Sequence, residues 1–139
     1  MTQHPEQRRL NRLAASYNKK ARKYGVSGYA TAVSLARKPQ RCHYCGIDLE
    51  VGQGTFDHVM SFDKGGTNED ENIVRSCLTC NRRKFTKSPA EFEHHQNLVV
   101  ACSVCGKEYT PRWGEWINGR ARVCSRVCSG KKRWIGDTK

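Results

Sequence analysis

The chain has 139 residues, of which 37% are hydrophobic, and its formal net charge is +12. This length allows one small domain, or one domain with a small added module, and the low apolar content argues against a large hydrophobic core. No apolar run is long enough to cross a bilayer, and the polar stretch after Met1 does not resemble a signal segment, so we expect a protein of the reducing cytoplasm.

The charge is unevenly distributed along the chain. Residues 1–41 contain ten Lys/Arg and one acid, residues 42–100 contain six and nine, and residues 101–139 contain nine and three. Two basic segments therefore flank a mildly acidic centre. Basic segments suit a polyanion such as nucleic acid, because each neutralised phosphate releases a counterion. An acidic centre suits a site that collects a divalent cation, whereas a surface biased only toward solubility does not explain this segregation.

Helical periodicity dominates the first forty residues. Apolar and aromatic residues recur at steps of three and four over Pro5–Tyr24, which predicts an amphipathic helix that ends at Gly25. A second, shorter helix is predicted at about residues 28–37, because Pro39 forbids its extension. The basic side of the first helix is equally compatible with DNA contact and with the solvated face of a packing helix.

The centre of the chain alternates between strand and helix signals. Residues 55–59 predict a short strand, residues 65–68 a turn, and residues 73–74 the start of a returning strand. A helix is expected over residues 77–84. Residues 88–91, Ser-Pro-Ala-Glu, predict the start of another helix, because Ser caps a helix, Pro fits its first position, and Glu follows the cap by three residues.

All eight cysteines fall into four close pairs: Cys42/Cys45, Cys77/Cys80, Cys102/Cys105 and Cys124/Cys128. Close pairs taken two at a time are typical of tetrahedral zinc sites. The first two pairs predict one structural zinc site and the last two predict a second. The three-residue gap in the last pair fits thiolates one helical turn apart. A disulfide framework is the alternative, which a reducing compartment disfavours.

Chemically active side chains lie beside the first predicted zinc site. Asp57 and His58 lie within the 31 residues between Cys45 and Cys77, and Asn81 follows Cys80 directly. An imidazole can be neutral at working pH and can then accept a proton. Carboxylate and carboxamide oxygens suit a hydrated Mg²⁺ ion. The cysteines alone indicate only a structural zinc module, but together with these side chains they indicate metal-dependent phosphodiester hydrolysis.

Residues 40–95 resemble the HNH endonuclease family. The matching residues are Asp57-His58-Val59, Gly65-Gly66-Thr67-Asn68, Asn72-Ile73 and Cys77-Leu78-Thr79-Cys80-Asn81-Arg82-Arg83-Lys84. The resemblance implies an α+β fold with a small, zinc-stapled ββα-metal core, preceded by helices and followed by a four-cysteine zinc finger. It divides the chain into a basic helical arm (1–40), a nuclease core (41–97) and a basic finger (98–139).

The resemblance also implies roles for individual residues. His58 would be the general base, and Asp57 would bind the catalytic divalent ion, Mg²⁺ or Mn²⁺, together with Asn81. Asn72 would tie the loop backbone and hold the base in place. Asn81 stands where the family name has its final His, and a neutral carboxamide is the weaker ligand. Val59 stands where many members carry a proline.

Basic residues in two regions are expected to contact DNA. Lys84, with Arg82 or Arg83, would hold phosphates near the cut. In the C-terminal module, cations are interleaved with Trp113, Trp116 and Trp134, which suits backbone contact plus stacking. The same tryptophans could instead form the core of the finger. The cations predicted to bind DNA there are Arg120, Arg122, Arg126, Lys131, Lys132 and Arg133.

The sequence thus predicts an endonuclease that hydrolyses DNA, double-stranded DNA above all, with two structural zinc ions and a catalytic Mg²⁺ or Mn²⁺. Its expected location is the cytoplasm of a bacterium or a phage-infected cell. The alternatives are a non-catalytic, zinc-dependent protein that binds nucleic acid, and an enzyme that cleaves RNA. Homing, restriction and genome packaging all reuse such a core, so phage packaging or other DNA-processing proteins stay open as partners, as does the oligomeric state.

Overall fold

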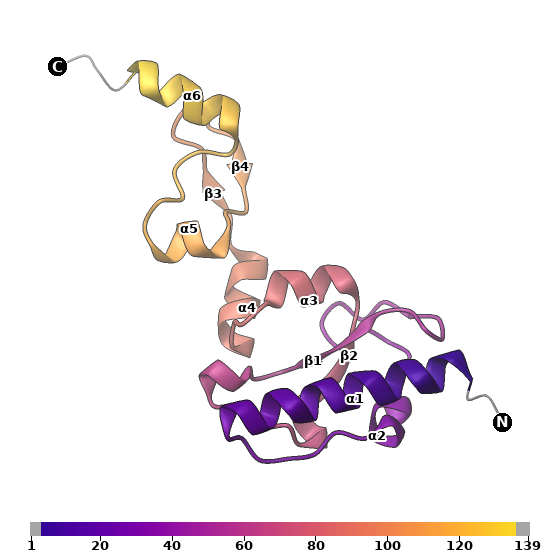
Figure 1. Ribbon diagram of the computed structural model, residues 1–139. Coiled ribbons are helices and arrows are strands. Elements are labelled where there is room, and N and C mark those ends of the chain that lie inside the picture. Colours follow the sequence, from indigo (N-terminus) through magenta and orange to yellow (C-terminus); the bar gives the residue numbers. More distant parts are fainter. Residues whose placement is uncertain (1–3, 136–139) are drawn as a thin grey trace. The chain divides into compact units, whose positions relative to one another are not determined.

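A computed structural model describes residues 4–135, with side chains described through Lys131. The chain divides into two compact units, Met1–Phe92 and Glu93–Lys139 (Figure 1). Within the described part of the chain, none of the helices combines the length and the apolar composition that crossing a bilayer requires.

The first helix, α1, spans Pro5–Tyr24 and confirms the bounds that its periodicity predicted. Its ends are capped: the His4 ring accepts a hydrogen bond from the backbone N–H of Glu6, and Gly25 adopts φ 64°. That left-handed conformation costs glycine little, so the helix ends there. The buried stripe of α1 consists of Leu10, Ala14, Asn18 and Ala21. Asn18 is the polar member of this stripe, and its side chain is hydrogen-bonded to the backbone of Ala30.

The second helix, α2, spans Ala32–Arg37 and begins four residues after the predicted start at residue 28. A capping box sets the beginning: Thr31 Oγ1 accepts from the Ser34 N–H at 3.0 Å, and Ser34 Oγ accepts from the Thr31 N–H at 3.1 Å. The backbone N–H and C=O of Ala30 are both bound by the side chain of Asn18. Because these groups are already engaged, the helix cannot extend back through them.

The sheet of the larger unit is an antiparallel hairpin of β1 (Thr55–His58) and β2 (Ile73–Ser76). Both predicted strands are therefore confirmed, with β1 ending one residue earlier than expected. In this register Asp57 lies opposite Val74, and His58 opposite Ile73. Two 3₁₀ turns, η1 (Phe62–Lys64) and η2 (Asp70–Asn72), shape the connection between the strands.

The helix α3 spans Leu78–Lys84, as expected, and packs against β1. Cys77 is its N-cap, and the sulfur of that residue accepts a hydrogen bond from the Cys80 N–H at 3.3 Å. Hairpin and helix together form a ββα unit, which confirms the predicted α+β class. Its most important consequence is spatial: α3 carries Asn81 and Lys84 to the side of the strand that carries Asp57.

Two small apolar clusters hold the larger unit together. One joins α1 and α2 to the hairpin and consists of Leu10, Ala14, Ala30, Leu35, Phe56 and Ile73. The other surrounds the first cysteine pairs and consists of Cys42, Leu49, Cys77, Cys80 and Phe92. Clusters of this size give a limited hydrophobic stabilisation, so a metal staple at the second cluster has a physical purpose.

The helix α4, Pro89–Asn97, begins at the predicted residue and carries the chain across the boundary between the units. The smaller unit then contains a two-stranded hairpin, β3 (Val100–Ala101) with β4 (Glu108–Tyr109), and the helices α5 (Trp113–Ile117) and α6 (Arg126–Ile135). Cys124 precedes α6 and Cys128 lies on it, so the two residues do not lie on one helix, although their sulfur atoms are 3.7 Å apart.

A small aromatic cluster supports the smaller unit. His95 is buried, its Nε2 lies 2.8 Å from the Pro111 carbonyl oxygen, and its ring packs on that of Trp113 at 5.4 Å. Trp116 is 38% exposed. Trp113 is half-buried against His95 within the smaller unit, which favours the packing interpretation for this tryptophan.

The acid sensitivity of the larger unit should depend in part on Glu91. Its carboxylate accepts from the Ser88 N–H at 2.7 Å and pairs with Lys64 at 2.9 Å. Lys64 and the Ser88 backbone hold the pKa of Glu91 at about 2. Because this folded-state pKa lies below the unfolded value of about 4.3, the stabilisation is complete above about pH 4.3 and is lost as the pH falls toward 2.

We expect Glu91→Gln to lower the free energy of unfolding by about 1 kcal/mol at neutral pH, since the carboxylate is partly exposed and screened. The difference from the wild type should shrink in acid. Urea titrations at several pH values measure both effects. Glu93→Gln, the same change on the same helix, is the control and should have little effect. A Glu91→Gln penalty that persists unchanged in acid would contradict the assignment.

Candidate active site and metal clusters

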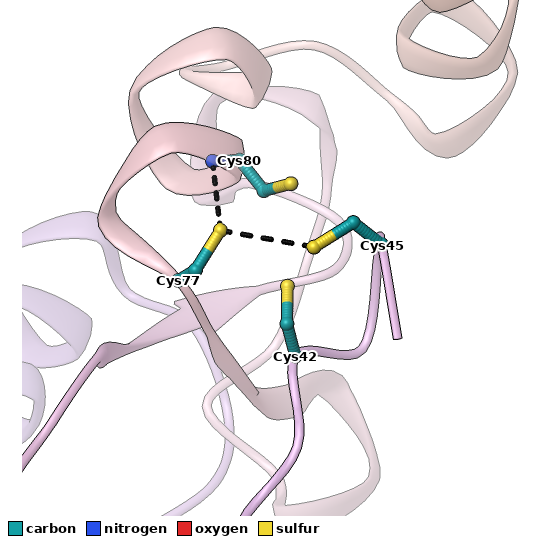
Figure 2. A group of neighbouring side chains, drawn as sticks. All are labelled: Cys42, Cys45, Cys77 and Cys80. Atoms are coloured by element: carbon teal, nitrogen blue, oxygen red, sulfur yellow. Dashed lines mark hydrogen bonds between the residues drawn. The ribbon is translucent and has the colours of Figure 1, made fainter. Parts of the chain in front are cut away.

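Four thiols converge where the turn after Arg41 meets the start of α3 (Figure 2). The sulfur atoms of Cys42, Cys45, Cys77 and Cys80 all lie within 4.8 Å of one another, and the Cys45 and Cys77 sulfurs are 3.9 Å apart. A disulfide requires about 2.05 Å, whereas a tetrahedron with Zn–S bonds of about 2.3 Å has edges of about 3.8 Å. This donor set fits a tetrahedral metal ion.

A second cluster of the same kind lies in the smaller unit. It consists of Cys102, Cys105, Cys124 and Cys128, whose sulfur atoms also lie within 4.8 Å of one another. The Cys105–Cys124 and Cys124–Cys128 sulfur distances are 3.6 and 3.7 Å. Both values match the tetrahedral edge of about 3.8 Å, so this cluster could also hold a metal ion.

Both clusters begin with the same backbone turn. Gly46 donates its N–H to the carbonyl of Cys42 at 2.9 Å, and Gly106 donates to that of Cys102 at 2.9 Å. Each glycine has φ 72°. Burial alone would raise the thiol pKa values, but backbone N–H groups directed at the sulfurs lower the pKa of Cys42 to about 7 and that of Cys102 to about 6. The turn therefore favours the thiolate, which is the form that binds metal.

Asp57 on β1 is held by two side chains from different segments. Its Oδ2 accepts a hydrogen bond from the Tyr44 hydroxyl at 2.5 Å and pairs with Lys84 Nζ at 3.2 Å. Tyr44 comes from the turn between Cys42 and Cys45, and Lys84 from the end of α3. Both of these contacts are made to Oδ2.

The structure assigns Lys84 a role different from the predicted phosphate contact. Its side chain is 0% exposed, and its ammonium donates to the His58 carbonyl at 2.8 Å in addition to pairing with Asp57. A buried ammonium with two partners cannot reach a phosphate outside the protein. Lys84 instead supports the backbone and the carboxylate of the Asp57-His58 pair. The prediction that Lys84 contacts DNA is therefore wrong, because the sequence does not show which way α3 turns this side chain.

His58 is enclosed by aromatic rings and bound at one nitrogen. Its ring lies 5.0 Å from that of Tyr17 and 4.5 Å from that of Phe62. Its Nε2 lies 2.9 Å from Asn68 Oδ1. Burial lowers the pKa of His58 below its ordinary value, against the opposing effects of Asn68 and Asp57. The imidazole is therefore neutral at physiological pH, which is the state a general base requires.

Asn72 clamps the loop that connects the two strands. Its Oδ1 accepts from the Met60 N–H at 2.8 Å, and its Nδ2 donates to the carbonyls of Met60 at 2.9 Å and Thr67 at 2.7 Å. These are contacts to backbone on both sides of the loop, of the kind that the family resemblance implied. The carboxamide thus closes the loop behind His58.

Three of the four predicted catalytic side chains open onto one pocket of about 300 Å³ in the larger unit, and Asn72 is not among its lining residues. Asp57, His58 and Asn81 line it together, so the structure brings these three predicted residues to one place. The remaining lining residues are Lys20, Ser61, Phe62, Asp63, Arg82, Phe85 and Thr86. The oxygens of Asp57 and Asn81 fit a hard divalent cation that keeps several waters. The positive charge of Arg82 at the same pocket suits a phosphate.

The other cations predicted to bind DNA are mostly on the surface. Arg83 is exposed beside Arg82. Among the cations predicted to bind DNA in the smaller unit, the exposed ones are Arg120, Arg122, Arg126 and Lys131. The side chains of Lys132 and Arg133 lie outside the described residues. Exposure makes phosphate contact feasible for this set, and their role in DNA binding stays a prediction.

Sequence reasoning missed Tyr44 and Asn68 as site residues. Tyr44 was given no role there, and Asn68 entered only as part of the predicted turn and of the segment that resembles the HNH family. One local signal existed for Tyr44: a residue inside a metal-binding turn has a fixed direction once the two cysteines are bound. Asn68 had no such signal, because its partner on β1 lies ten positions away.

The ion pair between Lys84 and Asp57 yields a stability prediction. Lys84→Met keeps most of the side-chain volume but leaves the largely buried carboxylate without its cation, which should cost about 3 kcal/mol of unfolding free energy. Arg83→Met, at the neighbouring exposed position, should change it by less than about 0.5 kcal/mol. Urea unfolding in zinc-containing buffer measures both. Adding Asp57→Asn to Lys84→Met should recover part of the loss, and equal costs for the two single Met variants would contradict the ion pair.

Comparisons with known proteins agree with this geometry. Residues 42–87 match the family model "HNH endonuclease". The chain is also similar to the CRISPR-associated endonuclease Cas9 of Corynebacterium diphtheriae, with 27% identity over 79% of this chain. The chain spans only 10% of the length of that protein. The matched segment contains the first four-cysteine cluster, the hairpin and α3. Residues 42–87 of this chain are therefore a domain of the HNH endonuclease family.

Proposed function

We propose that this protein is a metal-dependent endonuclease that hydrolyses phosphodiester bonds of DNA, with His58 as the general base. The observation that carries the proposal is the shared pocket of Asp57, His58 and Asn81 inside a segment that matches the HNH family. A carboxylate, a neutral imidazole and a carboxamide are the groups that such a hydrolysis requires.

Each side chain has a distinct task in this proposal. The unprotonated nitrogen of His58 takes a proton from the water that attacks the phosphorus atom. Asp57 and Asn81 would hold Mg²⁺ or Mn²⁺, and such an ion would supply Lewis-acid stabilisation of the negative charge that develops during hydrolysis. Asn72 does not contact the substrate; it acts indirectly, by holding the loop that follows His58. Arg82 binds a phosphate beside the cut.

Two structural zinc ions support this arrangement. Zinc at the first cluster joins the turn that carries Tyr44 to the start of α3, which carries Asn81 and Lys84. These are the segments that face Asp57, so the ion determines how well the pocket is assembled. Zinc at the second cluster organises the finger and its exposed arginines. Thiolate clusters of this kind suit a reducing compartment, and we infer the cytoplasm of a bacterium or a phage-infected cell.

We infer double-stranded DNA as the substrate from the charge distribution. Ten Lys/Arg and one acid precede the nuclease domain, and nine Lys/Arg and three acids follow residue 100. Contacts from these segments would release counterions from the phosphates, so affinity should fall steeply with salt concentration. Residues 42–100 between these segments carry six Lys/Arg and nine acids, a net negative charge that suits a divalent ion.

The principal test is the cleavage of plasmid DNA in the presence of Mg²⁺. His58→Ala should lower the rate of cleavage by about 10²- to 10⁴-fold, which is the contribution of a positioned general base, while DNA binding in a gel-shift assay remains. His43→Ala, which changes an exposed imidazole near the first cluster, is the matched control. Equal cleavage by wild type and His58→Ala would refute the base assignment. Absence of cleavage by the wild type with any divalent ion would favour a non-catalytic DNA-binding protein.

Metal content separates the tasks of the two clusters. Wild-type protein should contain two zinc ions per chain, and Cys45→Ser and Cys105→Ser should each contain one, because each change removes an exposed ligand from a different cluster. Mass-spectrometric metal analysis measures this. Cys45→Ser should lose cleavage, whereas Cys105→Ser should keep cleavage and bind DNA more weakly. A wild-type chain without zinc would overturn the assignment of both clusters.

A further inference from the structure

A chain of buried hydrogen bonds connects His58 to the N-terminal helix. His58 Nε2 lies 2.9 Å from Asn68 Oδ1, and Asn68 Nδ2 donates to Asn18 Oδ1 at 2.8 Å. Asn18 in turn binds both backbone groups of Ala30: its Oδ1 accepts from the N–H at 2.8 Å, and its Nδ2 donates to the carbonyl at 2.9 Å. Asn68 is 0% exposed, Asn18 5% and Ala30 2%.

The backbone of Ala30 determines the donor and the acceptor in every hydrogen bond of this series. A backbone N–H can only donate and a carbonyl can only accept, so the oxygen of Asn18 must face the N–H and its nitrogen must face the carbonyl. Asn68 then meets the oxygen of Asn18 and must present its own nitrogen there. The oxygen of Asn68 is therefore turned to His58. An oxygen acceptor requires that Nε2 carry the hydrogen, which leaves Nδ1 of the neutral ring unprotonated.

Backbone contacts hold Asn68 in this position. Its N–H donates to the Ser27 carbonyl at 2.7 Å. Gly28 packs so closely that a Cβ atom added there would lie 2.3 Å from the backbone carbon of Asn68. The segment between α1 and α2 is thus fitted against the loop that carries Asn68. An amide that is buried and anchored on both sides cannot rotate freely, so the direction of its hydrogen bonds is preserved.

Two aromatic residues restrict the remaining freedom of the imidazole. Tyr17 and Phe62 lie against the ring from two elements, and the Tyr17 hydroxyl is itself fixed by a 2.7 Å hydrogen bond to the Phe56 carbonyl. A flipped ring would place a carbon atom against Asn68 Oδ1 and lose that bond. Nε2 thus faces the interior. Nδ1 is consequently the nitrogen that a water molecule in the pocket can reach.

We propose that Asn68 and Asn18 are positioning residues that hold His58 in the Nε2–H tautomer and present Nδ1 to the attacking water. The catalytic part of this inference rests on the proposed nuclease function. It makes the basic N-terminal helix, which supplies Asn18 and Tyr17, a part of the catalytic apparatus. The family motif includes Asn68 but gives no sign of its bond to Asn18, because Asn18 lies fifty positions earlier in the sequence.

The tautomer can be observed directly, without any nuclease assay. We suggest nitrogen NMR of the full, zinc-loaded chain with ¹⁵N-labelled histidine, in mildly alkaline, magnesium-free buffer, with the His58 signals assigned from the spectrum of His58→Ala. The wild type should show a protonated Nε2 and an unprotonated Nδ1. A wild-type ring with the hydrogen on Nδ1, or with an even mixture of tautomers, would overturn the proposal.

Variants at Asn18 test whether the donor and acceptor roles set by Ala30 are transmitted through Asn68 to His58. Asn18→Asp keeps an oxygen acceptor for Ala30 and Asn68, so the wild-type tautomer should persist. Asn18→Leu removes that acceptor, frees Asn68 to rotate and should give mixed tautomers. Asn11→Asp and Asn11→Leu make the same changes on the exposed side of α1 and should leave the His58 signals unchanged. Identical spectra for Asn18→Asp and Asn18→Leu would refute the proposed control of the His58 tautomer by Asn18.

Kinetics then distinguish positioning from general damage. Asn68→Leu should lower kcat about 10- to 100-fold, within the total contribution of a general base, while the KM for DNA changes little. Circular dichroism and zinc content verify the fold, and the control Asn11→Leu on the exposed side of α1 should retain the activity. An unchanged kcat in Asn68→Leu would contradict the proposal. Wild type with the expected tautomer but no cleavage would instead refute the nuclease assignment and uphold the hydrogen-bond chain.

Discussion

The larger unit depends on the junction that four sulfur atoms make between two segments of the chain. The first segment is the turn of Cys42 and Cys45, and the second is the start of α3 at Cys77 and Cys80. The two are separated by 31 residues, and the apolar clusters around them are small. The sulfur atoms lie at the spacing of a tetrahedral site, so a bound ion can supply cohesion that the core does not. The Tyr44 hydroxyl and the Lys84 ammonium both contact Asp57 Oδ2; Tyr44 lies in the first segment, and Lys84 lies at the end of the helix that begins in the second.

Around this junction, the interior is unusually polar for so small a unit. Lys84, Asn68 and Asn18 are nearly or fully buried, and each has found hydrogen-bonding partners. Burying such groups costs free energy, and apolar residues of similar volume would pack at lower cost. Their benefit is directional: an ion pair orients Asp57, and a series of amides orients His58. This unit therefore gives up some stability for the geometry of two adjacent side chains.

The smaller unit repeats the metal-binding turn without the side chains around it. Its first cysteine, Cys102, lies in the same kind of turn. Gly106 has a positive φ there, and backbone N–H groups lower the pKa of the Cys102 thiol. No Asp-His pair accompanies that turn; exposed arginines surround it instead. The same cysteine turn thus occurs twice, once beside the pocket of Asp57 and His58 and once in a unit with exposed arginines.

The sequence by itself determined the features that depend on local spacing. The bounds of α1, the two strands, the cap of α4 and both cysteine clusters follow from rules that act over a few residues, and the structure confirms them. The placement of Asp57, His58 and Asn81 around one pocket also followed, because a family motif records positions that a fold brings together.

Only the tertiary structure decided how these residues are supported. It directs Lys84 inward to an ion pair with Asp57 and places the Tyr44 hydroxyl in a hydrogen bond to the same carboxylate. It also brings Asn18 into a hydrogen bond with Asn68. It also delayed the start of α2, because Asn18 binds the backbone of Ala30 first. Each outcome depends on which distant group meets a buried donor or acceptor. A buried polar group must find a partner wherever the fold offers one, and sequence spacing carries no record of that choice.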